Sequence, residues 1–305
     1  MTDARDAIAG SQPPPSPSAR PAAALRTKIA LSIVAVYVIW GSTYLGLRFA
    51  LESFPPFLLG GIRYSLAGLL AYVLARRSGL RSPTAREWRA SLLTGFLLFA
   101  LGNGLVGVAE HWIDSGVASV VVATAPLWAV LFASLFGDRP SRTEMIGLAL
   151  GLCGVVLLQR GDALGGSMIG IVAIVVAPMA WSRGAVLGAH VSLPQGAMAS
   201  ASQMITGGEW MLAISFVRGE QMKPLTASAL IAFAYLVVFG SFVAFSAFQF
   251  LLRHTRPALA NSGAFVNPIV ALVLGALIAG EVLTIYHLFA CMLTGLAVFA
   301  VLKKR

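Results

Sequence analysis

The chain has 305 residues, of which 58% are hydrophobic and only 11% are charged, and its mean hydropathy is +0.83. This balance leaves too little polar surface for a soluble domain of that size, so composition alone indicates an integral membrane protein. The net charge of +10 does not indicate a nucleic-acid partner, because the Lys and Arg residues form short clusters between apolar stretches.

The N-terminal stretch is polar and rich in Ala, Pro and Ser, so residues 1–28 are predicted to form a disordered cytoplasmic tail. Ten apolar stretches follow, each close to the ~20 residues that cross the hydrocarbon core as a helix. The predicted fold is therefore all-α, with ten transmembrane helices at about 29–49, 57–75, 90–109, 116–137, 143–159, 167–188, 196–217, 227–251, 258–280 and 283–302.

Basic residues predict the orientation of these helices. With a cytoplasmic N-terminus, sixteen Lys and Arg residues of the tails and connections fall on the cytoplasmic side. Only Arg160, Arg218 and Lys223 then fall outside. The positive-inside rule therefore predicts that both termini are cytoplasmic, which an even number of spans allows.

Two long apolar stretches resemble each other. Ser115–Asp138 and Ala258–Glu281 share a small-residue start, a proline in mid-helix and a closing Gly-acid pair. The spacing in sequence between the two prolines is almost the same as the spacing between Trp40 and Trp181. A nearly constant offset predicts an internal repeat.

The repeat divides the chain into residues 29–160 and 167–303, each with five predicted helices. Because five is odd, the second repeat enters the membrane from the side opposite to the first. Such inverted repeats are typical of secondary transporters, in which the substrate site lies between the repeats near the middle of the bilayer.

Four short motifs carry a resemblance to a known family: Trp-Gly-Ser-Thr-Tyr at 40–44, and the segments Gly102–His111, Val120–Leu127 and Val266–Glu281. Together they resemble the EamA family of the drug/metabolite transporter superfamily, over essentially everything from residue 29 to residue 302. The resemblance implies a ten-helix exporter of small metabolites in the bacterial inner membrane. It also implies a central cavity lined mainly by the first, third, fourth, sixth, eighth and ninth spans.

Polar and aromatic side chains near mid-bilayer depth are candidates to line that cavity, since polar groups in hydrocarbon need partners or water. These candidates are Trp40, Ser42, Asn103, Thr124, Trp128, Trp181, Gln203, Phe265 and Asn267. The alternative is that the small polar side chains hydrogen-bond between helices as packing contacts. The carbonyls freed by Pro126, Pro178 and Pro268 meet either a substrate or a Ser or Thr hydroxyl.

Charged residues inside the predicted spans are costly and therefore functional candidates. Arg63 is expected either to face the bundle, where it pairs with an acid such as Glu281 or meets an anionic substrate group, or to snorkel to the surface. Glu209 is predicted near mid-bilayer, either as a proton carrier in an antiport cycle or as a protonated, hydrogen-bonding side chain. Arg183 is the base nearest to Glu209 in sequence, but it lies more than two helical turns away along the predicted hairpin.

At the external rim, Glu110 and His111 either sense external pH or are simply solvated at a helix end. Gly147 and Gly151 have the spacing of a close helix contact.

The motifs of other classes are missing. Cys153 and Cys291 indicate neither a disulfide framework nor a metal site, and the chain has no ATP-binding P-loop and no hydrolase or zinc motif. No catalytic residue, metal or cofactor is therefore assigned.

The sequence predicts a secondary transporter that exports small organic metabolites, such as amino acids, their analogues or drugs, by alternating access. Its expected partners are a small-molecule substrate, membrane lipid and, in one version, protons. Neither nucleic acid nor ATP is among them. The alternatives are an uncoupled facilitator, or a membrane enzyme or sensor, whose reactive cluster or signalling domain the sequence lacks.

Overall fold

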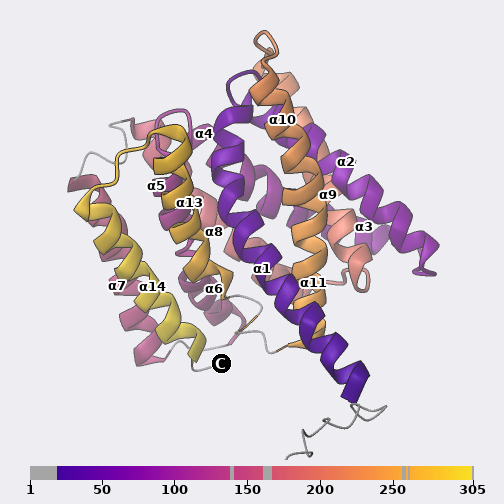
Figure 1. Cartoon of the computed structure of the whole chain (residues 1–305). Helices are drawn as coiled ribbons and strands as arrows, with labels where there is room; N and C mark the ends of the chain where they lie inside the picture. The colour runs from indigo at the N-terminus through magenta and orange to yellow at the C-terminus, as the bar shows by residue number, and fades with distance from the viewer. Residues whose placement is uncertain (1–18, 138–140, 161–166, 256–258, 260–261, 304–305) are drawn as a thin grey trace, which may run out of the picture.

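A computed structural model describes residues 19–137, 141–160, 167–255, 259 and 262–303. All the regular secondary structure of these residues is helical, and Figure 1 shows the helices side by side in one bundle. Six helical segments are long and apolar enough to cross a membrane: 24–50, 56–77, 85–109, 115–136, 168–190 and 227–251. Two shorter apolar helices cover 266–279 and 285–297. Each of these segments overlaps a predicted span.

The first half of the chain contains α1 (Ala19–Ala50), α2 (Pro56–Arg77), α3 (Ala85–Gly95), η1 (Phe96–Asn103), α4 (Gly104–Ala109), α5 (Ser115–Val122), α6 (Ala125–Ala133), η2 (Ser134–Phe136) and α7 (Arg142–Arg160). The second half contains α8 (Met168–His190), α9 (Ala197–Arg218), α10 (Ala227–Tyr235), η3 (Leu236–Val243), α11 (Ala244–His254), α13 (Gly263–Ala279) and α14 (Ile285–Lys303). The segments η1 and η3 are π-helices, and η2 is a short 3-10 turn.

The helix α1 begins earlier than the sequence analysis predicts. Residues 19–28, placed there in the disordered tail, are helical. They are rich in Ala, Leu, Arg and Lys, which are strong helix formers, and they continue directly into the apolar span. The rest of the predicted tail lies outside the described residues.

Unusual backbone features recur at the offset found in the sequence. The two π-helices start at Phe96 and at Leu236. Two glycines with positive φ, Gly79 (+85°) and Gly219 (+63°), have the same spacing in sequence as those two starts, and each follows the second helix of its half. The repeat seen in the sequence therefore extends to local backbone geometry.

The two halves run in opposite directions. The last turn of α1 lies beside the start of α5, where Arg48 contacts Asp114. The first turn of α8, at Gly170, packs against Trp112 of the same connection. The equivalent helices α1 and α8 therefore end and begin, respectively, at the same end of the bundle, which is at the top of Figure 1.

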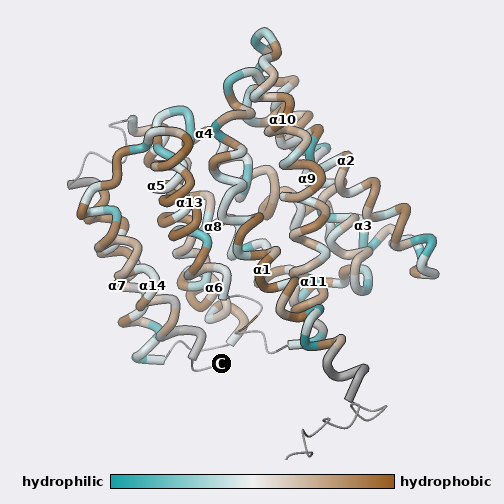
Figure 2. The backbone as a smooth tube through the Cα atoms, in the orientation of Figure 1, coloured by the Kyte–Doolittle hydropathy of each residue, from teal (hydrophilic) through white to brown (hydrophobic). Residues whose placement is uncertain are grey.

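Two pairs of equivalent helices pack against each other across the halves. The helix α2 runs along α9, and α7 runs along α14. Figure 1 shows these pairs at opposite sides of the bundle, with α1, α4, α5, α8 and α13 between them. Figure 2 shows that the strongly hydrophilic residues lie mainly at helix ends and in connections.

Small residues allow these close contacts. A methyl group built at Gly208 of α9 would lie 2.7 Å from the backbone nitrogen of Ser65 in α2, and one at Gly68 would lie 2.8 Å from that of Ile205. In the second pair, a methyl group at Gly154 of α7 would lie 2.9 Å from the side-chain oxygen of Thr294 in α14 and 3.2 Å from the carbonyl oxygen of Ala290. The Gly207-Gly208 pair therefore serves packing, and α9 continues through it as one helix.

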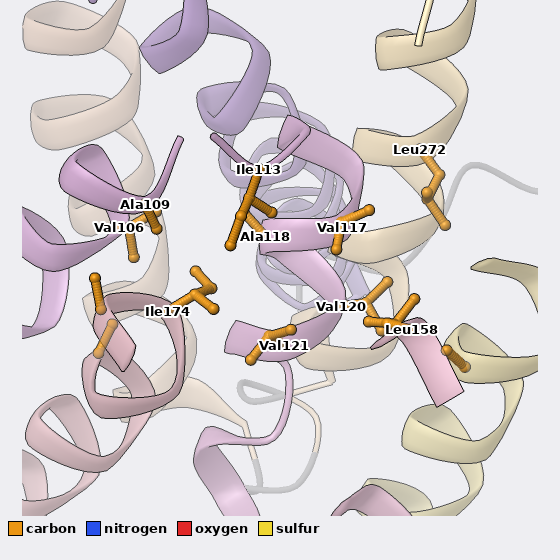
Figure 3. Packing of buried hydrophobic residues seen from close by; sticks show 13 residues of the cluster. Val106, Ala109, Ile113, Val117, Ala118, Val120, Val121, Leu158, Ile174 and Leu272 are labelled. Atoms are coloured by element: carbon orange, nitrogen blue, oxygen red, sulfur yellow. The ribbon is translucent and has the colours of Figure 1, made fainter. Parts of the chain in front are cut away.

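A buried apolar cluster fills the middle of the bundle toward its upper end. Figure 3 shows Val106, Ile113, Val120 and Ile174 converging from α4, α5, α8 and the connection before α5. This cluster holds the start of α5 in place, next to the charged groups described below.

The glycine contact between α2 and α9 predicts an asymmetry between two substitutions. Gly208→Ala should destabilise the protein by ~1–3 kcal/mol, because the methyl group meets backbone atoms that cannot move aside. Gly295→Ala in α14, where nothing lies within 4 Å of the new methyl group, should be neutral or stabilising by up to ~1 kcal/mol. Thermal unfolding in detergent measures both, and equal melting temperatures for the two variants would contradict the packing described.

Candidate functional site

Two equivalent tryptophans pack against one phenylalanine. Trp40 of α1 lies 5.3 Å, between ring centroids, from Phe245 of α11, and Trp181 of α8 lies 6.5 Å from the same ring. Phe99 of η1 completes the group at 6.1 Å from Trp181 and 6.0 Å from Phe245. The sequence analysis selects both tryptophans but misses both phenylalanines, because phenylalanine is common in every span and carries no polar signal.

The π-helices provide hydrogen-bond acceptors beside this aromatic group. The indole nitrogen of Trp40 donates to the carbonyl of Gly240 in η3, at 3.3 Å. In η1 the amide of Asn103 donates to the carbonyl of Leu98, at 3.1 Å. A π-turn widens the helix and alters its carbonyl ladder, and such turns are frequent at functional sites.

Three of the small polar candidates have partners in the helices. Ser42 donates to the carbonyl of Val38 at 2.7 Å, and Thr124 donates to that of Val121 at 2.7 Å. Gln203 donates to the hydroxyl of Thr94 at 2.9 Å, so it joins α9 to α3. Ser42 also contacts the hydroxyl of Tyr235 in α10 at 2.5 Å, so Ser42 and Gln203 link helices, whereas the bond of Thr124 stays within its own segment.

The other candidates differ in surroundings. When the side-chain amide of Asn267 is turned so that its nitrogen faces the two nearby carbonyls, it donates to Gly263 at 3.1 Å and to Tyr37 at 3.3 Å. Asn267 then joins α13 to α1. Trp128 is half-buried on α6. The side chain of Phe265 lies outside the described residues. Near Pro126, where α5 and α6 are separated by a turn, Ser182 of α8 donates to the carbonyl of Ala125 at 2.6 Å.

A carboxylate from the second half binds the first half at the upper end of the bundle. Glu281, whose side chain is only 4% exposed, accepts hydrogen bonds from the backbone nitrogens of Ser115 (3.0 Å) and Gly116 (3.1 Å) at the start of α5. Arg48 of α1 donates to the same carboxylate at 2.5 Å and to Asp114 at 2.9 Å. Charge-assisted bonds at a helix N-terminus are among the stronger polar contacts in proteins.

Glycines shape the chain around Glu281. Gly280 adopts a left-handed conformation, φ +67°, which ends α13 and turns the chain back so that the nitrogen of Glu281 donates to the carbonyl of Gly275 at 3.0 Å. A side chain at Gly275 would collide with the Glu281 carboxylate. The Gly-acid pair noted in the sequence is therefore a helix end that aims its acid at another helix.

The sequence analysis misses a second contact of this kind. Gly219 ends α9 in the left-handed conformation, and the next residue, Glu220, accepts from the backbone nitrogen of Leu58 at the start of α2, at 2.9 Å. The signal is present in the sequence as another Gly-acid pair. We call the end of the bundle that carries both contacts the capped end.

Glu110 lies at the capped end without a partner. It is 9% exposed, directly after the apolar segment 85–109, and neither carboxylate oxygen has a hydrogen-bond partner among the described residues. Burial, helped by the nearby charge of Glu281, raises the pKa of Glu110 well above its ordinary value of 4.5, and Arg48 opposes the shift. Burial therefore favours the neutral form of this carboxyl.

His111 is exposed and contacts the carbonyl of Gly107. The interpretation that Glu110 and His111 are both solvated is wrong for Glu110, because α4 turns that carboxyl inward.

The three charged candidates within the helices differ in how deeply they are buried. Glu209 is exposed on the face of α9 that also presents Phe216, which is 87% exposed, so it points away from the bundle. Arg183 is half-buried and lies 5.5 Å from the ring of Phe132 in α6. Arg63 is buried in α2 at 7% exposure. The expected contact of Arg63 with Glu281 is replaced by the contact of Glu281 with Arg48.

A cavity opens toward the other end of the bundle. It has a volume of about 190 Å³ and lies between α2, α9, η3 and α11. Its wall runs from Ser241 and Phe245 near the aromatic group to Gln249 and His254 at the end of α11. We call this end, where α2 finishes at Arg77, the basic end.

Among the described residues, no group of three or more His, Cys, Asp or Glu side chains is placed to hold a metal ion. Cys153 and Cys291 are both free thiols.

Comparisons with known proteins cover almost the whole bundle. The family model of the EamA-like transporter family matches the chain twice, over residues 27–160 and 168–303. The uncharacterized inner membrane transporter YedA of Escherichia coli strain K12 is 41% identical over 274 residues, or 88% of each chain. The uncharacterized transporter YdfC of Bacillus subtilis strain 168 is 28% identical over 84% of this chain and 85% of its own.

A crystal structure of another protein has the same fold. It superimposes with a TM-score of 0.64 over 90% of this chain and 96% of the other, at 18% sequence identity. At that identity the likeness concerns the fold alone.

The buried carboxyl of Glu110 predicts a pH dependence. An acid whose pKa is raised by folding stays neutral at low pH, and its ionisation costs stability as the pH rises from about 4.5 through the raised value. Glu110→Gln should therefore match the parent in melting temperature at pH 4.5 and exceed it by ~2 °C or more at pH 8.

The matched control for this prediction is Glu52→Gln, which alters an exposed acid at the same end. Melting curves between pH 4.5 and pH 8 provide the measurement. If the Glu110→Gln and parent proteins followed parallel curves across that range, the assignment of a neutral buried carboxyl would be lost.

Proposed function

Because this chain is a member of the EamA-like transporter family, we propose that it is a secondary transporter that exports small organic metabolites by alternating access. Like its relative YedA, it is a multi-pass protein of the bacterial inner membrane. The proposed cargo is a small organic molecule such as an amino acid, an analogue or a drug.

The difference between the two ends of the bundle carries the proposal. At the capped end, Glu281 and Glu220 of the second half bind helix starts of the first half. At the basic end, a cavity reaches inward as far as the aromatic group around Phe245. A bundle that is closed at one end and hollow at the other corresponds to one state of an alternating-access cycle.

The proposed topology gives this state a direction. We place ten spans in two inverted repeats, 29–160 and 167–303, behind a cytoplasmic tail, 1–28, with both chain termini in the cytoplasm. The basic end then faces the cytoplasm, in accord with the positive-inside rule, and the cavity faces inward. An exporter needs such a state to load its cargo.

The packing suggests which parts move. The helices α2 and α9 are interlocked through Gly68 and Gly208, where side chains would collide with backbone. The contacts of Glu281 are polar and lie at the tips of α1, α5 and α13. We therefore propose that α2 and α9 form the pivot and that the contacts of Glu281 break when the capped end opens.

The proposed energy source is an ion gradient. The first coupling mechanism to test is antiport, in which the substrate leaves the cell as protons enter. The chain has no P-loop for ATP. Glu209 suits the coupling role less well than the sequence suggests, because it faces away from the bundle. Glu110 is better placed, since its buried carboxyl lies beside the contacts that would open.

Transport by the purified protein tests the proposal. In proteoliposomes loaded with labelled amino acids and related metabolites, we expect saturable flux of at least one solute, accelerated by an opposing proton gradient. Glu110→Gln should reduce that acceleration. Glu209→Gln, which changes a side chain directed away from the bundle, should leave it unchanged.

The outcomes separate the alternatives. Flux that ignores the proton gradient would identify an uncoupled facilitator. A complete lack of protein-dependent flux across the panel would contradict the transporter proposal itself.

A further inference from the structure

Arg63 places a permanent positive charge inside the bundle. It sits on α2 and is 7% exposed. Its Nε atom donates to the hydroxyl of Ser241 in η3 at 2.6 Å, and its guanidinium carbon lies 4.7 Å from the centroid of the Tyr64 ring. An arginine stays charged in any protein environment, so this charge needs a counter-charge or water.

No carboxylate supplies that counter-charge. Among the described residues, none lies within the 4.0 Å of Arg63 that defines an ion pair. Glu281 is occupied by Arg48 and the start of α5. Arg63 therefore has two terminal nitrogens with no hydrogen-bond partner in the described part of the chain, which is an expensive arrangement for a buried group.

The π-helix η3 makes room for this guanidinium. A methyl group built at Gly240 would lie 3.1 Å from the Nη2 atom of Arg63. The next residue, Ser241, holds the Nε atom and also lines the cavity that opens at the basic end. Ser241, whose own surface is buried, therefore separates the inner wall of the cavity from the guanidinium by a single side chain.

Apolar side chains line much of the cavity, and polar side chains stand at both of its ends. Ser241 lies at its inner end, and Met204, Phe242 and Phe245 form much of the surface around it. Nearer the mouth, Gln249 donates to Ser200 at 2.7 Å, and His254 stands at the end of α11. Such a shape suits a small molecule with an anionic group and an apolar remainder.

We propose that Arg63 and Ser241 bind a carboxylate group of the transported molecule, while its apolar part lies against Met204 and Phe245. The substrates are then small organic molecules that carry a carboxylate, amino acids among them. A planar guanidinium can donate two parallel hydrogen bonds to a carboxylate, and the Ser241 hydroxyl can donate a third. A phosphate group fits less well, because a dianion usually gathers more than one cation.

This inference rests on the proposed transport function and names its substrate class. It is tested by counterflow in proteoliposomes with labelled L-leucine, L-phenylalanine and phenylacetate. Each acid and its amide serve as unlabelled competitors, and inorganic phosphate is a further competitor. We expect at least one acid to compete ~10- to 100-fold better than its amide, the range expected for hydrogen bonds to a charged group.

Substitutions assign the preference to the site. Arg63→Gln should reduce the acid-to-amide ratio to about one, and Arg63→Lys should leave an intermediate ratio, because it keeps the charge but loses the planar pair of donors. Arg183→Gln is the matched control, since Arg183 also lies within a helix but faces Phe132. It should keep the parent ratio.

A second variant keeps the test decisive if Arg63→Gln is not monodisperse in detergent. Ser241→Ala removes only the hydroxyl and should lower the ratio several-fold without loss of the protein.

Four results would overturn the inference. They are an unchanged ratio in folded Arg63→Gln, a parent protein that accepts amides as well as acids, competition by phosphate equal to that of the best acid, and an unchanged ratio in Ser241→Ala. Flux of neutral or cationic solutes without any of the labelled acids would refute the carboxylate site and leave the transporter proposal standing. Flux of no solute at all would refute both.

Discussion

The most extensive polar contact at the capped end joins one carboxylate to one helix start. The first backbone N–H groups of a helix have no partner within it, and at α5 they point toward the second half of the chain. Glu281 accepts two of them and is held by Arg48. A buried carboxylate that lost these donors would be destabilised by ~3–5 kcal/mol, so the contact is either made or replaced by water. In this structure the contact is made, and the proposed transport cycle would require it to break.

The inverted repeat determines where such a contact can lie. Equivalent helices pack against each other as α2 with α9 and α7 with α14. A side chain at Gly68 would collide with the backbone of α9, whereas one at Gly154 would first meet the side-chain oxygen of Thr294. The helices between these pairs also have close glycine contacts, at Gly41 with α13 and at Gly116 with Leu272, and beside them lie the aromatic contacts of Phe245 and the polar contacts of Glu281.

Much of the architecture can be predicted from the sequence, and little of the site. Apolar length locates the helices, and the offset between Trp40 and Trp181 reveals the repeat, because both are properties of residue order. The face of a helix on which a residue lies depends on its neighbours in space. Sequence reasoning therefore predicts an inward-facing role for Glu209, which its exposed position on α9 does not support. It also predicts an ion pair between Arg63 and Glu281, whereas in the structure Glu281 pairs with Arg48. The partnerless carboxyl of Glu110 depends on which donors surround it, and residue order does not encode that.

The opening of the capped end is most directly measured as a distance across it. Spin labels at His111→Cys and Val282→Cys, two exposed positions in opposite halves, would be placed in a chain that lacks Cys153 and Cys291. Pulsed electron paramagnetic resonance in lipid nanodiscs then reports the distribution of their separation. We predict two populations, with Arg48→Ala shifting the balance toward the longer distance. A single distance that is the same with and without Arg48 would contradict the account.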